Sequence, residues 1–118
     1  MGNPEKLSAE VMGEKLGIGK IRRHVFLCFG PDCVEREKGQ ATWEYLKRRL
    51  VELGLGTPKG EVYRTRCECL RVCNEGPICV VYPEGAWYRN VTVENMERIV
   101  QEHLIGGRVV EEICFARK

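Results

Sequence analysis

The sequence has no long apolar run, no strong excess of one charge and no internal repeat. Its longest apolar stretches are much shorter than the ~20 residues that a membrane-spanning helix needs, and the residues after Met1 are polar, so we expect neither a membrane span nor a secretion signal. The formal net charge is only +2. Nucleic-acid-binding domains concentrate basic residues more strongly, so nucleic acid is not an expected partner.

Recognisable catalytic patterns are also missing. The sequence shows no paired acid and base, no nucleophile with a neighbouring base, and no glycine-rich phosphate loop. Its glycines are scattered and read as turn residues. We therefore predict that the chain is not itself an enzyme, although it can be a subunit of one.

Cysteine, in contrast, is abundant, with seven residues in 118. An odd number argues against a closed disulfide framework. Together with the polar start of the chain, this predicts a soluble protein of a reducing compartment, the cytoplasm. In such a compartment, clustered cysteines more often bind a metal or perform redox chemistry than form structural disulfides.

The length predicts one domain, and 43% of apolar and aromatic residues is enough for a core. Residues 1–20 are expected to be an N-terminal extension that carries a short helix capped by Ser8. Residues 21–118 are expected to form the domain. Its strands are predicted at 21–29, 61–66, 78–82 and 86–89, its helices at 40–53 and 93–104, and a last strand or extended tail at 109–115.

This order of elements is typical of an α/β fold with a thioredoxin-like mixed β-sheet of four to five strands, flanked by two main helices. Cys28 then ends the first strand, and the loop that carries Cys69 and Cys73 precedes the third. If these strands are neighbours, both cysteine groups lie at the same end of the sheet. With Cys33 in the turn after the first strand, four thiolates can converge on one centre.

Three occupants of such a centre compete. Zinc accepts four thiolates, although its structural sites usually use closely spaced pairs. An iron–sulfur cluster also takes four cysteines, and uneven spacing suits a two-iron centre, which is wider than one ion. A dithiol enzyme would normally show C-x-x-C at the first strand–helix junction, where this chain has C-x4-C.

A family resemblance separates these alternatives. Residues 69–73, followed by Gly76-Pro77, an apolar strand, the stretch 82–85 and Trp87-Tyr88, resemble the thioredoxin-like [2Fe–2S] ferredoxins. The similarity extends over residues 21–115 and includes the stretch 102–107. The C-x4-C spacing of the first pair resembles, in addition, the related [2Fe–2S] subunit of NADH dehydrogenases.

The resemblance implies a [2Fe–2S] cluster, one-electron transfer between redox partner proteins, and a homodimer. The family's ligand pattern falls on Cys28, Cys33, Cys69 and Cys73. The expected partner is a flavoprotein or another iron–sulfur enzyme. The alternative is a thioredoxin-fold zinc or dithiol module that binds or regulates a partner without redox turnover.

Other residues compete for roles at this centre. Cys67 is the main rival of Cys69, because alternate residues of a strand point the same way. Cys79 is expected to be a small buried residue, and Cys114 a core or surface thiol. His24 and His103 are expected to be ordinary surface or edge histidines rather than Rieske-type ligands.

Arginines are predicted to surround the same centre. Their positive charge would favour the reduced cluster and attract a partner with an acidic patch. The alternative is an ordinary solvated strand face. The residues concerned are Arg22, Arg23, Arg64, Arg66 and Arg71.

Overall fold

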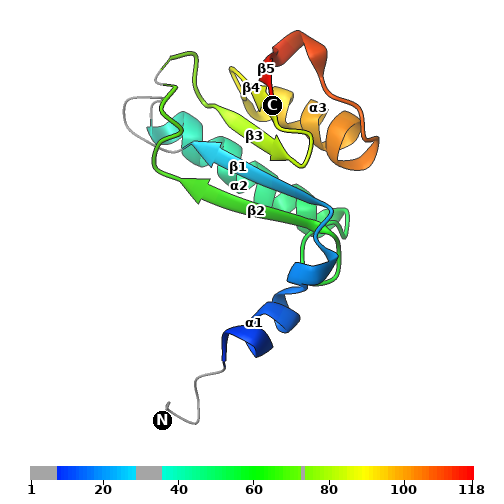
Figure 1. Cartoon of the computed structure of the whole chain (residues 1–118). Coiled ribbons are helices and arrows are strands. Elements are labelled where there is room, and N and C mark those ends of the chain that lie inside the picture. Colours follow the sequence, from blue (N-terminus) through cyan, green and yellow to red (C-terminus); the bar gives the residue numbers. More distant parts are fainter. Residues whose placement is uncertain (1–7, 29–35, 73) are drawn as a thin grey trace.

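The computed structural model describes residues 8–28, 36–72 and 74–118, which contain a five-stranded mixed sheet (Figure 1). Its strand order is β2-β1-β3-β4-β5. β1 and β2 are parallel, and all other neighbours are antiparallel. The strands are β1 (Arg23–Cys28), β2 (Val62–Cys67), β3 (Cys79–Tyr82), β4 (Ala86–Tyr88) and β5 (Cys114–Arg117). The predicted mixed sheet is confirmed. The last strand begins at Cys114 rather than at residue 109, because Glu111–Ile113 form a 3₁₀ turn.

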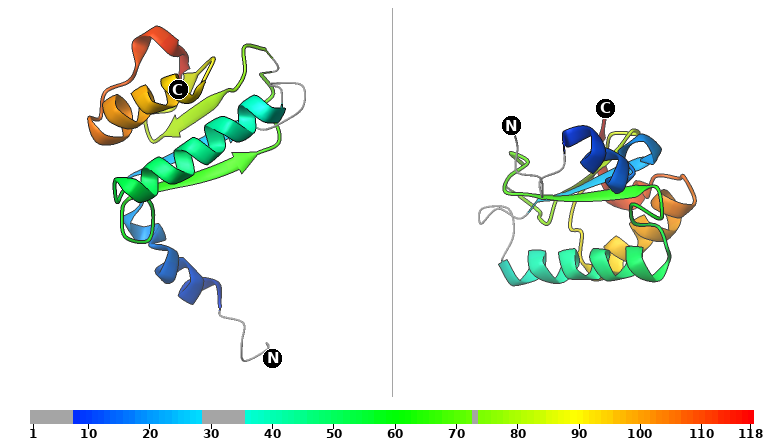
Figure 2. Two further views of the ribbon diagram at one scale, coloured as in Figure 1. Left: turned by 180° about the vertical axis from the view of Figure 1, so that it is seen from behind. Right: turned by 90° about the horizontal axis from the view of Figure 1, so that it is seen from below.

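Two helices cover one face of this sheet (Figure 2). α2 spans Arg36–Glu52, and α3 spans Val93–Arg98 and continues as the π-helical segment η2, Ile99–Ile105. The main core lies between these helices and the sheet and contains Val25, Leu27, Trp43, Leu46, Leu50, Val81, Tyr88, Met96 and Val100. None of the helices in the described part of the chain is both long and apolar enough to cross a membrane.

The predicted boundaries of α2 were wrong at both ends. The helix begins at Arg36 rather than at residue 40. Leu53, the last residue of the expected range, follows the helix end and is 37% exposed. The local reason is that Gly54 adopts a positive φ of 66°, and the chain turns there before Leu53 can reach the core.

The opposite face of the sheet is not covered by α2 or α3. Among the described residues after the N-terminal segment, no other helix covers it. Because side chains alternate along a strand, Val25 and Leu27 point into the core, whereas His24 and Phe26 lie on the uncovered face. Aromatic contacts continue across it, from His24 to Tyr63 and from Phe26 to Tyr82. This uncovered face carries the partly exposed rings of His24, Phe26, Tyr63, Tyr82, Trp87 and Phe115.

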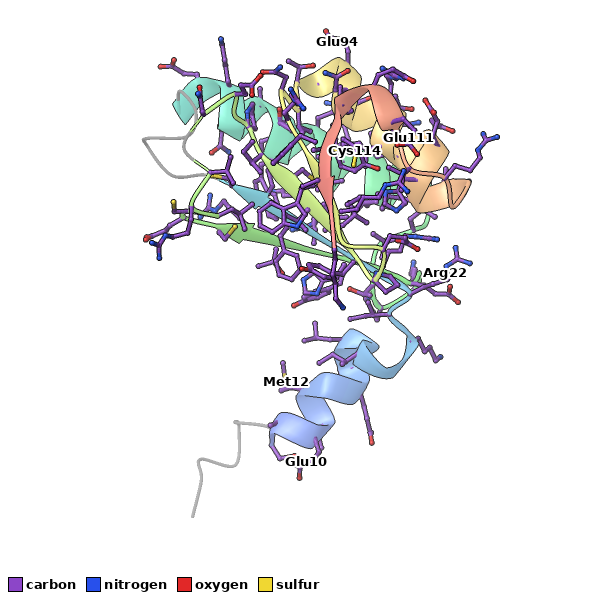
Figure 3. All side chains as sticks on the ribbon, turned by 45° about the horizontal axis from the view of Figure 1, so that its top comes forward. Glu10, Met12, Arg22, Glu94, Glu111 and Cys114 are labelled. Carbon is purple, nitrogen blue, oxygen red and sulfur yellow. The ribbon has the colours of Figure 1, made fainter. Side chains whose placement is uncertain are left out.

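The N-terminal segment extends away from the sheet (Figures 1 and 3). α1, Ala9–Leu16, is capped by Ser8, whose hydroxyl accepts from the Val11 N–H at 3.2 Å. Gly17 ends it with a φ of 75°, and the 3₁₀ turn η1, Ile18–Lys20, follows. The predicted Ser8 cap is confirmed. None of the residues of α1 is buried.

His103 was predicted as a surface or edge histidine, and this is wrong, because its side chain is fully buried. The Val110 N–H donates to Tyr88 Oη at 3.1 Å, so the Tyr88 hydroxyl is free to donate to His103 Nδ1 at 2.7 Å. His103 Nε2–H then donates to Glu84 at 2.9 Å, and Arg23 donates two bonds to that carboxylate. A neutral His103 satisfies every group in this chain of hydrogen bonds.

The buried chain predicts a loss of stability in mild acid. Burial lowers the pKa of His103 below its ordinary 6.5, and the bond to Glu84 opposes this only in part. Below about pH 6.5 the unfolded chain therefore binds a proton that the folded chain does not, so the free energy of unfolding falls as the pH drops. Burial alone would raise the pKa of Glu84, but bonds from Arg23 and His103 lower it, which adds a loss at more acid pH.

Urea unfolding at pH 7.5 and 5.5 measures this effect. The wild type should lose stability between the two values, and His103→Gln should lose less, because the glutamine does not titrate. Burial also lowers the pKa of His24, so part of the slope should remain in the variant. Equal slopes for the two proteins would contradict the role of His103.

Candidate metal centre

One end of the sheet collects cysteines from two distant parts of the chain. β1 ends at Cys28, and its antiparallel neighbour β3 begins at Cys79. The loop before β3 therefore arrives where β1 finishes, and the Cys28 N–H donates to the Ile78 carbonyl at 2.9 Å. This confirms the expected meeting of Cys28 with the cysteine loop at one edge of the fold.

Cys67 lies beside Cys28 because the two residues pair in the parallel register of β1 and β2. Its thiol contacts the Leu27 carbonyl at 3.5 Å, while the Cys28 thiol contacts the Glu68 carbonyl at 3.9 Å. Burial raises the pKa of the Cys67 thiol, and negative charge on Cys28 and Cys69 raises it further. Negative charge on either neighbour thus affects the Cys67 thiol at this end of the sheet.

The backbone after Cys69 is shaped toward its sulfur. Cys69 is exposed, and the Arg71 N–H donates to Cys69 Sγ at 3.2 Å. Arg71 has a φ of 71°, a left-handed conformation that costs a non-glycine residue about 1–2 kcal/mol. An N–H group directed at sulfur favours a thiolate and is a common outer contact of metal-bound cysteines. The Cys69 sulfur is thus exposed and has one backbone N–H directed at it.

Two of the four predicted ligands, Cys33 and Cys73, lie outside the described residues. Within the described ranges, no three His, Cys, Asp or Glu side chains are close enough to hold a metal ion. The four-cysteine ligand set therefore stays a prediction. The donor type fits the expected group, because thiolates are the ligands that zinc and iron–sulfur clusters share.

Apolar side chains surround the buried side of the centre. Cys28 and Ile78 are fully buried and form a small core of their own, separate from the main core. We call this group with its neighbours the site cluster; the neighbours are Leu70, Val72, Trp87 and Phe115. Their contact limits water on the Cys28 side, whereas the Cys69 side is open to solvent.

The remaining cysteines of the described chain have other environments. Cys79 is fully buried in the main core, as predicted for a small buried residue. Cys114 is partly buried, and its thiol contacts the Ala116 carbonyl at 3.4 Å. Cys28, Cys67, Cys79 and Cys114 are free thiols in the structure.

The expectation that all five arginines surround the centre is wrong. Arg22 and Arg23 lie at the opposite end of β1 from Cys28 and pair with Glu61 and Glu84; Figure 3 labels Arg22 at the junction with the N-terminal segment. Arg64 lies over the Trp43 ring at 5.0 Å, on the helix-covered side. Of the five, Arg66 and Arg71 remain near the cysteine end.

Sequence reasoning missed a different arginine, Arg89. It follows β4 and contacts both Glu75, at 3.7 Å, and the Phe115 ring, at 5.5 Å. Glu75 belongs to the cysteine loop, and Phe115 belongs to the site cluster. No local motif marks Arg89, because its neighbours come from distant segments that only the folded sheet brings together.

Comparison with known proteins identifies similar chains. No protein-family model matches the sequence. A 2Fe–2S ferredoxin of Clostridium pasteurianum is 33% identical over 96 residues, which are 78% of this chain and 94% of that protein. A putative 2Fe–2S ferredoxin of Priestia megaterium is 35% identical over 91 residues, 77% of this chain and 68% of that protein.

Solved structures are similar as well. A thioredoxin-like [2Fe–2S] ferredoxin from Aquifex aeolicus superimposes with a TM-score of 0.69 at 26% sequence identity, covering 82% of this chain and 93% of that one. A second structure of the Aquifex aeolicus wild-type protein gives a TM-score of 0.68 at 27% identity. The arrangement of strands and helices is therefore shared.

Proposed function

The chain belongs to the thioredoxin-like [2Fe–2S] ferredoxins, and from this premise we propose that its cluster is bound by Cys28, Cys33, Cys69 and Cys73. It is an electron carrier and not an enzyme in its own right. The observation that carries the proposal is the meeting of Cys28 with the Cys69 loop at one end of the sheet. Cys67 is the alternative ligand, since its strand position places it next to Cys28.

The chemistry of the bound group is the reversible uptake of one electron. The residues of this chain hold it and shape its surroundings. The Arg71 N–H donates to Cys69 Sγ and thereby stabilises negative charge on that sulfur. The site cluster keeps water from the Cys28 side. The exposed Cys69 side leaves a short path to a docked partner.

The alternative, a zinc or dithiol module that regulates a partner, is not favoured, because the similar proteins are named as 2Fe–2S ferredoxins. Visible absorption separates the two functions. Protein purified without oxygen should be red-brown and should bleach with dithionite, taking up about one electron per chain. A colourless protein that binds zinc and takes up no electron would contradict the proposal.

The partner that fits this activity is a redox protein, a flavoprotein or another iron–sulfur enzyme, because a carrier without its own substrate needs a donor and an acceptor. We assign the protein to the cytoplasm. The free thiols of Cys28, Cys67, Cys79 and Cys114 support this assignment, since disulfides are rare in reducing compartments.

We also propose a homodimer that forms through the uncovered face of the sheet. Six partly exposed aromatic rings on one face make a larger apolar area than single scattered residues do, and such an area marks an interface. Trp87 and Phe115 contact each other edge to face and extend this face toward the cysteine end. In a two-fold dimer the same face serves both copies, so a second chain is the occupant that completes it.

A further inference from the structure

Backbone hydrogen bonds join the segment that begins at Arg89 to the loop before β3. The Arg89 N–H donates to the Ile113 carbonyl at 2.9 Å, and the next N–H, of Asn90, donates to the Glu75 carbonyl at 2.8 Å. The Val91 N–H donates to the Pro77 carbonyl at 3.0 Å. The two residues after Arg89 are thus bonded directly to the loop that follows the cysteine pair.

The side chain of Arg89 turns toward the same region. Its guanidinium lies 5.5 Å from the centre of the Phe115 ring, and Phe115 belongs to the site cluster. Nη1 is 3.7 Å from Glu75 Oε1, and both side chains are partly exposed, at 39% and 53%. An exposed pair at this distance is weak, so Glu75 neutralises the guanidinium only in part.

The Nε atom of Arg89 has no acceptor in the described part of the chain, although it is buried. Leaving a buried N–H without a partner costs about 1–3 kcal/mol, and more than about 90% of buried polar groups have one. Arg89 Nε is the sole buried side-chain nitrogen or oxygen of the described residues in this condition. The neighbours of Arg89 are Glu75 of the cysteine loop and Phe115 of the site cluster. We therefore look for the acceptor of the Nε–H in the cysteine centre.

We propose that Arg89 is a positioning residue of the iron–sulfur centre, and that its Nε–H donates to the sulfur ligand sphere and stabilises the reduced state. The proposal rests on the proposed function. Reduction adds one electron and makes or breaks no bond in the protein. It changes the charge of an all-thiolate two-iron cluster from about −2 to about −3. A donor N–H on a cation interacts more strongly with the more negative state, so Arg89 raises the midpoint potential.

The experiment compares midpoint potentials, measured by reductive titration followed through the visible spectrum. Arg89→Lys keeps the charge but removes the Nε–H, and Arg89→Gln removes both. We expect both potentials to shift to more negative values, with the larger shift for Arg89→Gln. Arg22→Gln is the matched control, because it removes one exposed arginine about 20 Å from Cys28 at ~3.3 Å per strand residue. Its potential should equal that of the wild type.

The results separate this inference from the proposed function. Iron and sulfide in the wild type test the cluster itself, and their absence would remove the function and the inference together. If the wild type holds a cluster, an Arg89→Lys protein with the wild-type potential overturns the role of Arg89 and leaves the function intact. Should Arg89→Gln assemble no cluster, the potential of Arg89→Lys still decides. A shift of equal size in Arg22→Gln would also overturn it, because the effect would then be a general one of charge.

Discussion

Replacing Cys69 by alanine is expected to remove the cluster, lowering bound iron and sulfide to less than about a tenth of the wild-type content. Alanine supplies no ligand atom, whereas serine would leave an oxygen that can still bind iron. Cys69 is exposed and receives the Arg71 N–H, and its loop reaches the end of the sheet where Cys28 lies. Iron and sulfide analysis of anoxically purified protein measures the effect.

Two other cysteine variants serve as controls for this result. Cys67→Ala should keep the cluster, because the Cys67 thiol is directed at the Leu27 carbonyl. Cys114→Ala should keep it as well, because Cys114 is on β5 and contacts Ala116. A colourless Cys67→Ala protein beside a red-brown Cys69→Ala protein would reverse the assignment and make Cys67 the ligand.

Phe26→Asp is expected to convert the proposed dimer to a monomer. Phe26 lies on β1 near the middle of the uncovered face, stacks on His24 at 4.0 Å and contacts Tyr82 edge to face. A carboxylate there would be buried without a partner in the dimer. Loss of a central contact of this kind costs about 2 kcal/mol or more, which is about a 30-fold weaker association. Sedimentation equilibrium measures the dissociation constant.

Tyr63→Asp tests the same face from the edge strand β2, where a folding defect is less of a concern than on the central strand. Val51→Asp is the control, because Val51 is 78% exposed on α2, away from the uncovered face. It should leave the association unchanged. A wild type that sediments as a monomer, or a dimer that is equally stable in all three variants, would contradict the proposed interface.

Much of the fold could be predicted because its signals are local. The apolar run before Cys28 and the run after Gly76-Pro77 each specify a strand, and a side-chain cap specifies the start of α1 and of α3. The position of the cysteine loop followed from one added assumption, that the first and third strands are neighbours. The structure confirms that assumption.

The errors share a different cause, since each depends on which segments meet. Periodicity does not reveal that His103 points inward to Tyr88 and Glu84, because a histidine fits a buried helix face only when partners for both ring nitrogens are already there. Arg22 and Arg23 were assigned to the wrong end of the sheet. They are close to Cys28 in the sequence, but the extended strand β1 separates them from it in space. Arg89 had no sequence signal at all.

The central claim is that thiols from two distant segments meet at one end of the sheet and hold two irons. The content of iron, acid-labile sulfide and zinc in the anoxically purified full chain tests it most directly. The account predicts about two irons and two sulfides per chain and no stoichiometric zinc. One zinc per chain without sulfide, or a protein free of metal after reconstitution with iron and sulfide, would contradict it.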